Sequence, residues 1–178
     1  EEAARRGMKV VIADVEAGAM EQVVNDLRAT GTEAIGVLTD VTNAESVEAL
    51  AVATEQSFGP PNLLFNNAGV ASGGPIWEST EKDWKWLFGV NVDGVANGVR
   101  SFTPRMLAAA AADPGYEGCI VNTASMAGLV TAPGMGIYSV SKHAVLALSE
   151  CLYHDLDLIG RRVRAAGLCP FYVSTNIS

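Results

Sequence analysis

The chain has 178 residues, 49% of them hydrophobic, and its 20 acidic residues against 12 lysines and arginines give a formal net charge of −8. This size and apolar content suit one buried domain, residues 1–178, rather than two. The negative balance would repel phosphate backbones and anionic lipid, so we expect no nucleic-acid partner and no membrane surface. Purely apolar stretches, such as residues 107–112, are too short to cross a bilayer.

Cysteine usage and the first residues indicate the compartment. Cys119, Cys151 and Cys169 are widely separated and match no disulfide or metal-ligand spacing, so we expect no metal site. Each lies in an apolar segment, where a reduced cysteine behaves as a small hydrophobic side chain. The opening residues, EEAARRG, are charged and lack the apolar core of a secretory signal. We therefore expect a reduced protein in the cytoplasm.

Short apolar runs alternate with longer segments of helical period along the chain. The expected strands cover residues 9–13, 34–38, 63–66, 118–123 and 163–168, and the expected helices cover residues 16–30, 43–57, 80–112 and 135–159. Asn43 is typical of a helix start, and Gly31 and Gly160 are typical of helix ends. This alternation predicts an α/β fold: a doubly wound parallel sheet of Rossmann type, in three αβα layers.

The two longest expected helices each carry an apolar face. In the first, the face consists of Phe88, Val92, Val95, Val99, Phe102 and Met106, and Pro104 would bend the helix. In the last, it consists of Ala144, Leu148, Cys151, Leu152, Asp155 and Ile159. Burial against the sheet accounts for much of both faces, and packing between subunits is the alternative.

The stretch NTASMAGLVTAPGMGIYSVSKHA, residues 122–144, places Tyr138 and Lys142 one helical turn apart. A tyrosine has a pKa of about 10, so ionising it near neutral pH costs roughly 4 kcal/mol. An ammonium group about 5 Å away, at an effective dielectric constant near 20, returns on the order of 3 kcal/mol. With a second cation, such as an oxidised nicotinamide ring, Tyr138 would become a general base. A solvated helix often carries the same pair, so the pair alone does not distinguish a catalytic tyrosine from an ordinary surface residue.

Small and polar residues follow two of the expected strands. Ser125 comes after strand 118–123, at the edge where open α/β sheets bind ligands. It would donate a hydrogen bond to a substrate oxygen, or merely satisfy the turn backbone. The sequence NNAG, residues 66–69, would let a flat ligand approach the backbone closely, although an ordinary asparagine-rich turn is the better explanation of these four residues taken alone.

Two aspartates also lie after expected strands. The Asp14 carboxylate would accept hydrogen bonds from both hydroxyls of an adenosine ribose and would repel a 2′-phosphate. Asp40 would meet the adenine amino group, and Val41 would pack on the ring. Either aspartate could instead cap the helix that follows it.

Taken in order, these residues resemble the single-domain branch of the short-chain dehydrogenase/reductase family. The resemblance extends over essentially the whole chain and rests on Asp14, DV at 40–41, NNAG at 66–69, NVDG at 91–94, Ser125 and YSVSK at 138–142. Each element is weak alone, and the ordered set is specific.

The resemblance implies an oxidoreductase that transfers a hydride between NAD(H) and a secondary alcohol or ketone. Tyr138 would be the general acid/base, and Lys142 would lower its pKa and hold the nicotinamide ribose. Ser125 would polarise the substrate oxygen. Asn91 would support a water-linked proton path from Lys142.

The resemblance also implies a cofactor groove and an assembly. The groove would be lined by Asp14, Asp40, Val41, Asn67, Ala68, Gly69, Tyr138, Lys142, Pro170, Val173 and Thr175. Asp14 favours NAD over NADP. Family members assemble through the helices that correspond to residues 80–112 and 135–159, so we expect a homodimer or homotetramer.

The chain departs from the family pattern in three places. The glycine-rich turn that holds the pyrophosphate is absent together with its strand, Pro170–Phe171 replaces Pro-Gly, and the chain stops at Ser178. The absent strand belongs between residues 9–13 and 63–66, and without it each orphaned backbone group would cost about 1–3 kcal/mol. We therefore expect the 178 residues to be part of a longer protein, with no cooperative melt of their own.

The substrate side is expected to be apolar. Trp77, Met126 and Leu129, beside Ser125, suggest a moderately hydrophobic alcohol or ketone, although loop packing explains them as well. No charged residue is clearly placed for a substrate carboxylate or phosphate. The rival hypothesis is a non-catalytic NAD(P)-sensing regulatory protein on the same fold. The complete set of Asn91, Ser125, Tyr138 and Lys142 argues against that rival.

Overall fold

The computed structural model describes residues 1–160, 162–171 and 173. Its strands are β1 (Val10–Asp14), β2 (Ala34–Leu38), β3 (Leu63–Asn66), β4 (Gly118–Thr123) and β5 (Val163–Leu168). They form one sheet of order β1–β2 and another of order β3–β4–β5, and each of these pairings is parallel. The predicted strands are therefore confirmed, with only the first displaced, by one residue.

The main helices are α2 (Ala17–Ala29), α3 (Ala44–Phe58), α4 (Glu81–Phe88), α5 (Gly94–Ala112) and α6 (Gly136–Leu158), and shorter ones are α1 (Glu2–Arg5), η1 (Ile76–Glu78) and η3 (Met126–Gly128). The helix signals in the sequence are confirmed. The Asn43 side chain accepts hydrogen bonds from the backbone N–H groups of Glu45 and Ser46 at 2.8 and 3.2 Å. Gly31 and Gly160, with φ of 83° and 111°, follow the ends of α2 and α6.

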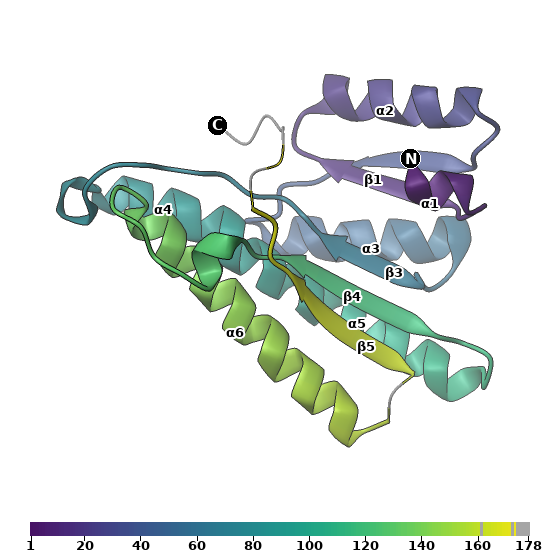
Figure 1. The fold of residues 1–178 in the computed structure, drawn as a ribbon. Coiled ribbons are helices and arrows are strands. Elements are labelled where there is room, and N and C mark those ends of the chain that lie inside the picture. Colours follow the sequence, from purple (N-terminus) through teal and green to yellow (C-terminus); the bar gives the residue numbers. More distant parts are fainter. Residues whose placement is uncertain (161, 172, 174–178) are drawn as a thin grey trace.

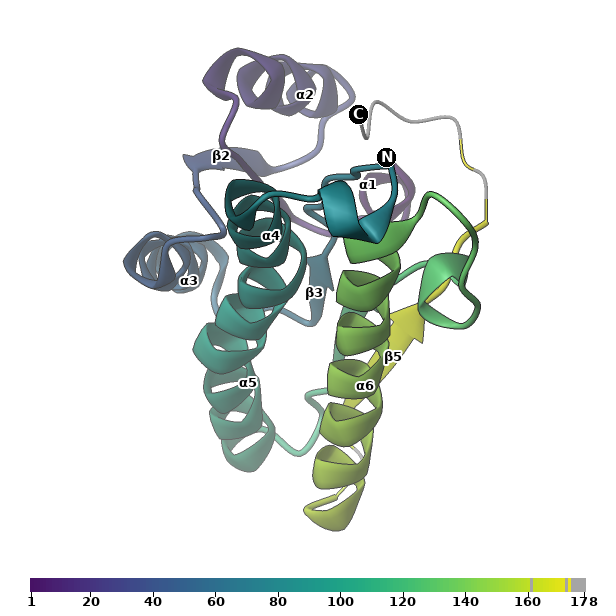
Figure 2. The same cartoon turned by 90° about the vertical axis from the view of Figure 1, so that its left-hand side faces the viewer.

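Helices lie on both faces of the strands, as the predicted three-layer α/β fold requires. Figure 1 shows α2 on one side and α3, α5 and α6 on the other, and Figure 2 shows α5 and α6 running side by side. The main core lies between this second helix layer and the sheet. Its buried apolar residues include Val47 and Ala51 of α3, Phe102 and Met106 of α5, Ile120 of β4, Leu156 of α6 and Val163 of β5.

The helix expected over residues 80–112 is divided into α4, a π-helical segment, η2 (Gly89–Asp93), and α5. Half of the predicted apolar stripe is fully buried, since Val95, Phe102 and Met106 are 3%, 3% and 0% exposed, and its other three members are partly buried. Pro104 lies inside α5, whereas the change in helical hydrogen bonding lies at η2. Such π segments are frequent at functional sites.

The predicted apolar face of α6 is only partly buried, and Ile159 is 65% exposed. The face that packs inward instead carries Ile137, Tyr138, Ser141, Lys142, Val145, Ser149 and Leu156. The sequence pattern misassigned this face because it counts serine and lysine as solvent-facing. Here hydrogen bonds offset the cost of burying them.

The two sheets leave a gap between β1 and β3. In the described part of the chain β1 pairs with β2 alone and β3 with β4 alone, and the β3 side chains of Leu63 and Phe65 are 40% and 47% exposed. The gap lies where the sequence analysis expects a further strand.

None of the described helices is long and apolar enough to span a membrane.

Candidate active site

Tyr138 and Lys142 lie in the first turns of α6, as their spacing predicts. They are 8% and 2% exposed, and the Lys142 Nζ lies 5.7 Å from the centroid of the tyrosine ring. The ammonium group donates a hydrogen bond to the carbonyl oxygen of Thr123, at the end of β4, over 2.9 Å. The structure therefore holds a buried cation beside the phenol.

Burial lowers the pKa of Lys142 from 10.5 to about 8, because an ammonium group loses hydration in the interior. Within residues 1–160, 162–171 and 173, no carboxylate lies within ion-pair distance of its Nζ. At neutral pH the side chain is still mostly protonated. Its charge is thus available to a neighbouring negative atom rather than neutralised by a partner.

Asn91 lies in the π segment and is completely buried. Its Oδ1 accepts from the Val70 N–H at 2.8 Å, and its Nδ2 donates to the Val70 carbonyl at 2.9 Å and to Ser141 Oγ at 3.0 Å. These bonds connect the loop after β3 to α6. Because they occupy the amide, a proton path past Asn91, which stays a prediction, would have to use other groups.

Sequence reasoning missed Ser141, a fully buried residue of α6 that contacts Asn91. Its hydroxyl accepts from the Asn91 amide and donates to the Tyr138 carbonyl oxygen at 2.8 Å. The signal was present in the sequence as a serine three positions after the tyrosine. A serine in a helix is usually exposed, however, and only the fold shows its partner.

Ser125 precedes η3 and is 9% exposed. Its Oγ accepts from the Ala127 N–H at 3.1 Å, so it does satisfy turn backbone. The described residues supply no acceptor for its own proton, which leaves that proton available to a ligand. The η3 segment lies directly on α6: a Cβ added at Gly128 would stand 2.6 Å from the carbonyl oxygen of Lys142.

The two aspartates expected at the adenosine are both exposed and neither is a helix N-cap. Oδ1 of Asp14 accepts from the Glu16 N–H at 2.9 Å. Oδ1 of Asp40 accepts from the N–H and hydroxyl of Thr42 at 2.9 and 2.8 Å. In each case the second carboxylate oxygen has no hydrogen bond to the described residues. Each aspartate thus shapes its loop and keeps an oxygen free.

Val41 packs inward. A Cβ added at Gly94 of α5 would stand 2.9 Å from Val41 Cγ2, and the Val41 carbonyl accepts from Asn97 at 2.9 Å. Packing of this side chain on an adenine ring stays a prediction.

The residues of NNAG meet the end of β4. Asn67 accepts from the Thr123 hydroxyl at 3.1 Å, and Asn67 and Ala68 are exposed. Gly69 lies over the site: a Cβ there would be 3.4 Å from Asn91 Oδ1 and 3.5 Å from Lys142 Nζ. Gly69 therefore packs directly against these two buried polar groups.

The predicted residues after β5 are placed only in part. The Pro170 carbonyl accepts from the Met126 N–H at 2.9 Å and so connects this segment to η3. Val173 is 60% exposed. Thr175 lies outside the described residues.

The predicted substrate residues come from two loops that both contact α6. Met126 follows Ser125 directly, and Leu129, four positions after Ser125, is 53% exposed. Trp77, 82% exposed, lies on η1, where Ile76 packs against Gly136 at the start of α6. Residues 70–77 and 126–135 contain no ionisable side chain.

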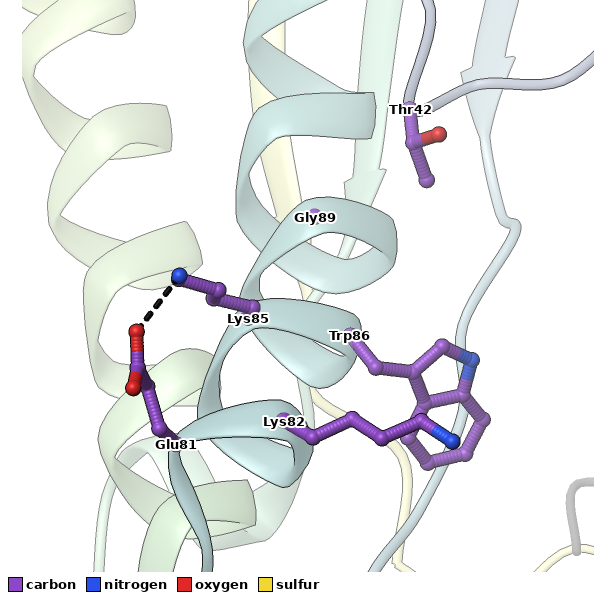
Figure 3. Close-up of a pocket in the computed structure, with 6 residues that line it drawn as sticks. All are labelled: Thr42, Glu81, Lys82, Lys85, Trp86 and Gly89. Atoms are coloured by element: carbon purple, nitrogen blue, oxygen red, sulfur yellow. Dashed lines mark ion pairs between the residues drawn. The ribbon is translucent and has the colours of Figure 1, made fainter.

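A cavity of about 520 Å³ lies away from the candidate active site, between α4 and Thr42. Figure 3 shows its lining, which consists of Thr42, Glu81, Lys82, Lys85, Trp86 and Gly89. Glu81 and Lys85 form an ion pair at 2.5 Å. None of the predicted catalytic side chains lines this cavity.

The structure thus combines parallel strands, carboxylates with a free oxygen at the end of β1 and after β2, and a buried tyrosine–lysine pair on the helix after β4, which together define an α/β protein of Rossmann type. Residues 1–178 match the family model described as short chain dehydrogenase. The chain belongs to the short-chain dehydrogenase family, as the sequence resemblance indicated.

Three known proteins illustrate the relationship. A short-chain dehydrogenase/reductase from Burkholderia phymatum, solved in complex with NAD, is 54% identical with a TM-score of 0.94, over 99% of this chain and 61% of its own. A gluconate 5-dehydrogenase from Burkholderia cenocepacia, solved with NADP and tartrate, is 28% identical with a TM-score of 0.87, over 98% and 65%. The CLA biosynthesis dehydrogenase/reductase of Lactiplantibacillus plantarum is 34% identical over 99% of this chain and 60% of its own length.

The chain therefore spans about three fifths of the length of these relatives.

Proposed function

We propose that the protein containing this chain is an NAD(P)-dependent dehydrogenase or reductase, acting on a secondary alcohol or ketone. The observation that carries the proposal is the buried ammonium group of Lys142, 5.7 Å from the Tyr138 ring and without a carboxylate partner in the described residues. A cation in this position stabilises negative charge on a nearby oxygen.

The proposed proton chemistry belongs to this chain's own residues. In alcohol oxidation the Tyr138 oxygen takes the substrate hydroxyl proton, and in ketone reduction it returns the proton. The Lys142 ammonium group stabilises the phenolate between these steps, and the free proton of Ser125 points the substrate oxygen toward Tyr138. Bound nicotinamide cofactor would accept or supply the hydride.

The residues present fit such a cofactor. Asp14 and Asp40 each keep one carboxylate oxygen free for ribose or adenine donors, and Gly69 packs beside the buried ammonium group. We propose NAD rather than NADP, because the exposed Asp14 carboxylate would repel a 2′-phosphate. The NAD and NADP complexes of the two Burkholderia proteins support the wider class of cofactor.

We propose a neutral, moderately hydrophobic substrate. The loops of residues 70–77 and 126–135 offer apolar side chains and no charge, so a substrate carboxylate or phosphate would remain unpaired there. Trp77, Met126 and Leu129 are the candidate contacts.

We propose a homodimer or homotetramer that assembles through α5 and α6. On α6, Val140, Tyr153 and Leu158 are exposed, at 41%, 49% and 84%. The three free cysteines support a reducing compartment, which we propose to be the cytoplasm.

The experiment that tests the proposal uses the full-length protein with NAD⁺ or NADP⁺ and a panel of uncharged secondary alcohols, followed by the absorbance of the reduced cofactor. We expect turnover with NAD⁺ and a loss of at least about 10³-fold in Tyr138→Phe, with cofactor binding retained. Cofactor binding without turnover across the panel, unchanged in Tyr138→Phe, would instead support the NAD(P)-sensing alternative.

A further inference from the structure

A row of buried side-chain hydrogen bonds runs from β3 through β4 to α6, behind the candidate site. Asn66 Nδ2 donates to Asn122 Oδ1 at 2.8 Å, and Asn122 Nδ2 donates to Ser149 Oγ at 3.0 Å. Ser149 Oγ in turn donates to the Val145 carbonyl at 2.7 Å. Asn122 and Ser149 are 0% and 2% exposed. Since Asn122 and Ser149 are closed to water, these two side chains depend on one another for hydrogen bonds.

This row repeats the arrangement at Ser141. Each serine accepts a hydrogen bond from an asparagine of a neighbouring element and donates to a carbonyl of its own helix. Ser141 and Ser149 are eight positions apart, slightly more than two helical turns, so both lie on the same face of α6. One such contact fixes a point on the helix. Two fix its rotation and its position along the sheet.

The contact between Asn122 and Ser149 lies close to the candidate active site, because Asn122 is on β4. Asn122 is followed by Thr123, whose carbonyl accepts the Lys142 ammonium, and two residues later by Ser125. A shift of α6 along β4 would therefore change the surroundings of Lys142 and its distance from Ser125 together. The apolar contacts of Val95, Ala124 and Val145 fill this interface, but apolar packing is not directional.

The opposite end of the row is equally close-packed. A Cβ added at Gly98 of α5 would stand 2.2 Å from Asn66 Oδ1, so glycine is needed for the asparagine to reach Asn122. On β5, a Cβ at Gly167 would be 3.4 Å from the Cβ of Ser149. Both glycines allow helices to approach the strands at the level of these hydrogen bonds.

We propose that Asn122 and Ser149 are positioning residues, which hold α6 in the register that keeps Lys142 dry and bonded to Thr123. The inference rests on the proposed function for its catalytic meaning. Its test measures the charge state of Lys142 itself and does not depend on turnover.

The test follows Lys142 in the full-length protein by NMR of ¹³C-labelled lysine side chains, with the signal assigned by its absence in Lys142→Met. In the wild type we expect a titration midpoint near pH 8. In Ser149→Ala the unpartnered Asn122 amide admits water and loosens α6, so we expect the midpoint to rise by about half a unit or more. Tyr138 is the ionisable side chain that faces this ammonium in the described structure.

A matched control is Thr54→Val in α3. Thr54 is 6% exposed and its hydroxyl donates to the carbonyl four residues earlier at 2.8 Å, as Ser149 does, but it contacts none of the site residues. We expect this variant to leave the Lys142 midpoint unchanged. Ser149→Cys keeps the size of the side chain with a weak acceptor, and carries the test if Ser149→Ala does not fold.

A lowered thermal midpoint in Ser149→Ala and Ser149→Cys with an unmoved Lys142 titration would overturn the proposal, because the residues would then be structural only. A wild-type midpoint near the ordinary 10.5 would overturn this inference, because Lys142 would then not be held dry, while the proposed function, which needs only a protonated ammonium group beside Tyr138, would stand. Absence of turnover in a wild-type protein whose Lys142 titrates near pH 8 would contradict the proposed function alone.

Discussion

At the scale of single residues, the charge of Lys142 couples the site to stability. Its pKa is lowered, so between pH 8 and 10.5 the unfolded chain binds more protons than the folded one. The free energy of unfolding should therefore rise with pH across this interval. Below pH 8 the full penalty for burying the charge is present, about 3 kcal/mol for this shift.

Lys142→Met in the full-length protein is expected to lose this rise and to lose activity. The methionine carries no charge to bury, so near pH 7 we expect little loss of stability even though the bond to Thr123 is gone. Urea unfolding at several pH values measures the difference. A variant that follows the wild-type pH dependence between 8 and 10.5 would contradict the prediction.

Gly128→Ala tests the contact of η3 with α6. The added Cβ would stand 2.6 Å from backbone oxygen of Lys142, so η3 must move away, at a cost of about 1–3 kcal/mol and with a loss of turnover.

The matched control is Gly18→Ala in α2, where a Cβ would have no neighbour within 4 Å. Helix propensity predicts that this change stabilises by about 0.5–1 kcal/mol. Thermal unfolding and turnover of both variants check the pair. Equal behaviour of the two would show that the close contact at Gly128 has no consequence.

At the scale of elements, the π segment exists where the Asn91 side chain binds both backbone groups of Val70. Asn91→Ala would leave those groups without their partner and would remove the hydrogen bond that Ser141 accepts. We expect a loss of about 2–4 kcal/mol in the free energy of unfolding, together with loss of activity, by chemical denaturation and the alcohol assay.

Asn97→Ala is the control for this element. Asn97 also lies in the helix that follows β3, is half-buried, and donates a single hydrogen bond to the Val41 carbonyl at 2.9 Å. Its loss should cost about 1 kcal/mol. If both variants lose the same stability, the two hydrogen bonds between Asn91 and the Val70 backbone contribute less than their geometry indicates.

At the scale of the whole molecule, the feature that matters most is the gap between β1 and β3. We propose that a further parallel strand of the full-length protein fills it, since in the described residues the facing edges of β1 and β3 are both unpaired and Phe65 stays half exposed. The 178 residues alone should then show no cooperative thermal transition, with the full-length protein as the control. A sharp melt of the isolated chain, followed by circular dichroism, would refute this.

Much of the fold followed from local sequence pattern. Apolar runs located the strands to within a residue, and the cap at Asn43 and the glycines after α2 and α6 located the helix ends. These signals are readable because they depend on neighbours within a few positions. The order of Asp14, NNAG, Ser125 and YSVSK was enough to identify the family.

Tertiary structure alone decided which face of α6 is buried and what satisfies it. Ser141 and Ser149 pair with asparagines that lie 50 and 27 positions earlier in the chain. The division of the helix at Gly89–Asp93, and the inward turn of Val41 onto Gly94, likewise depend on distant segments. Sequence patterns report propensity and period, whereas the partner of a buried polar group is set by the folded backbone.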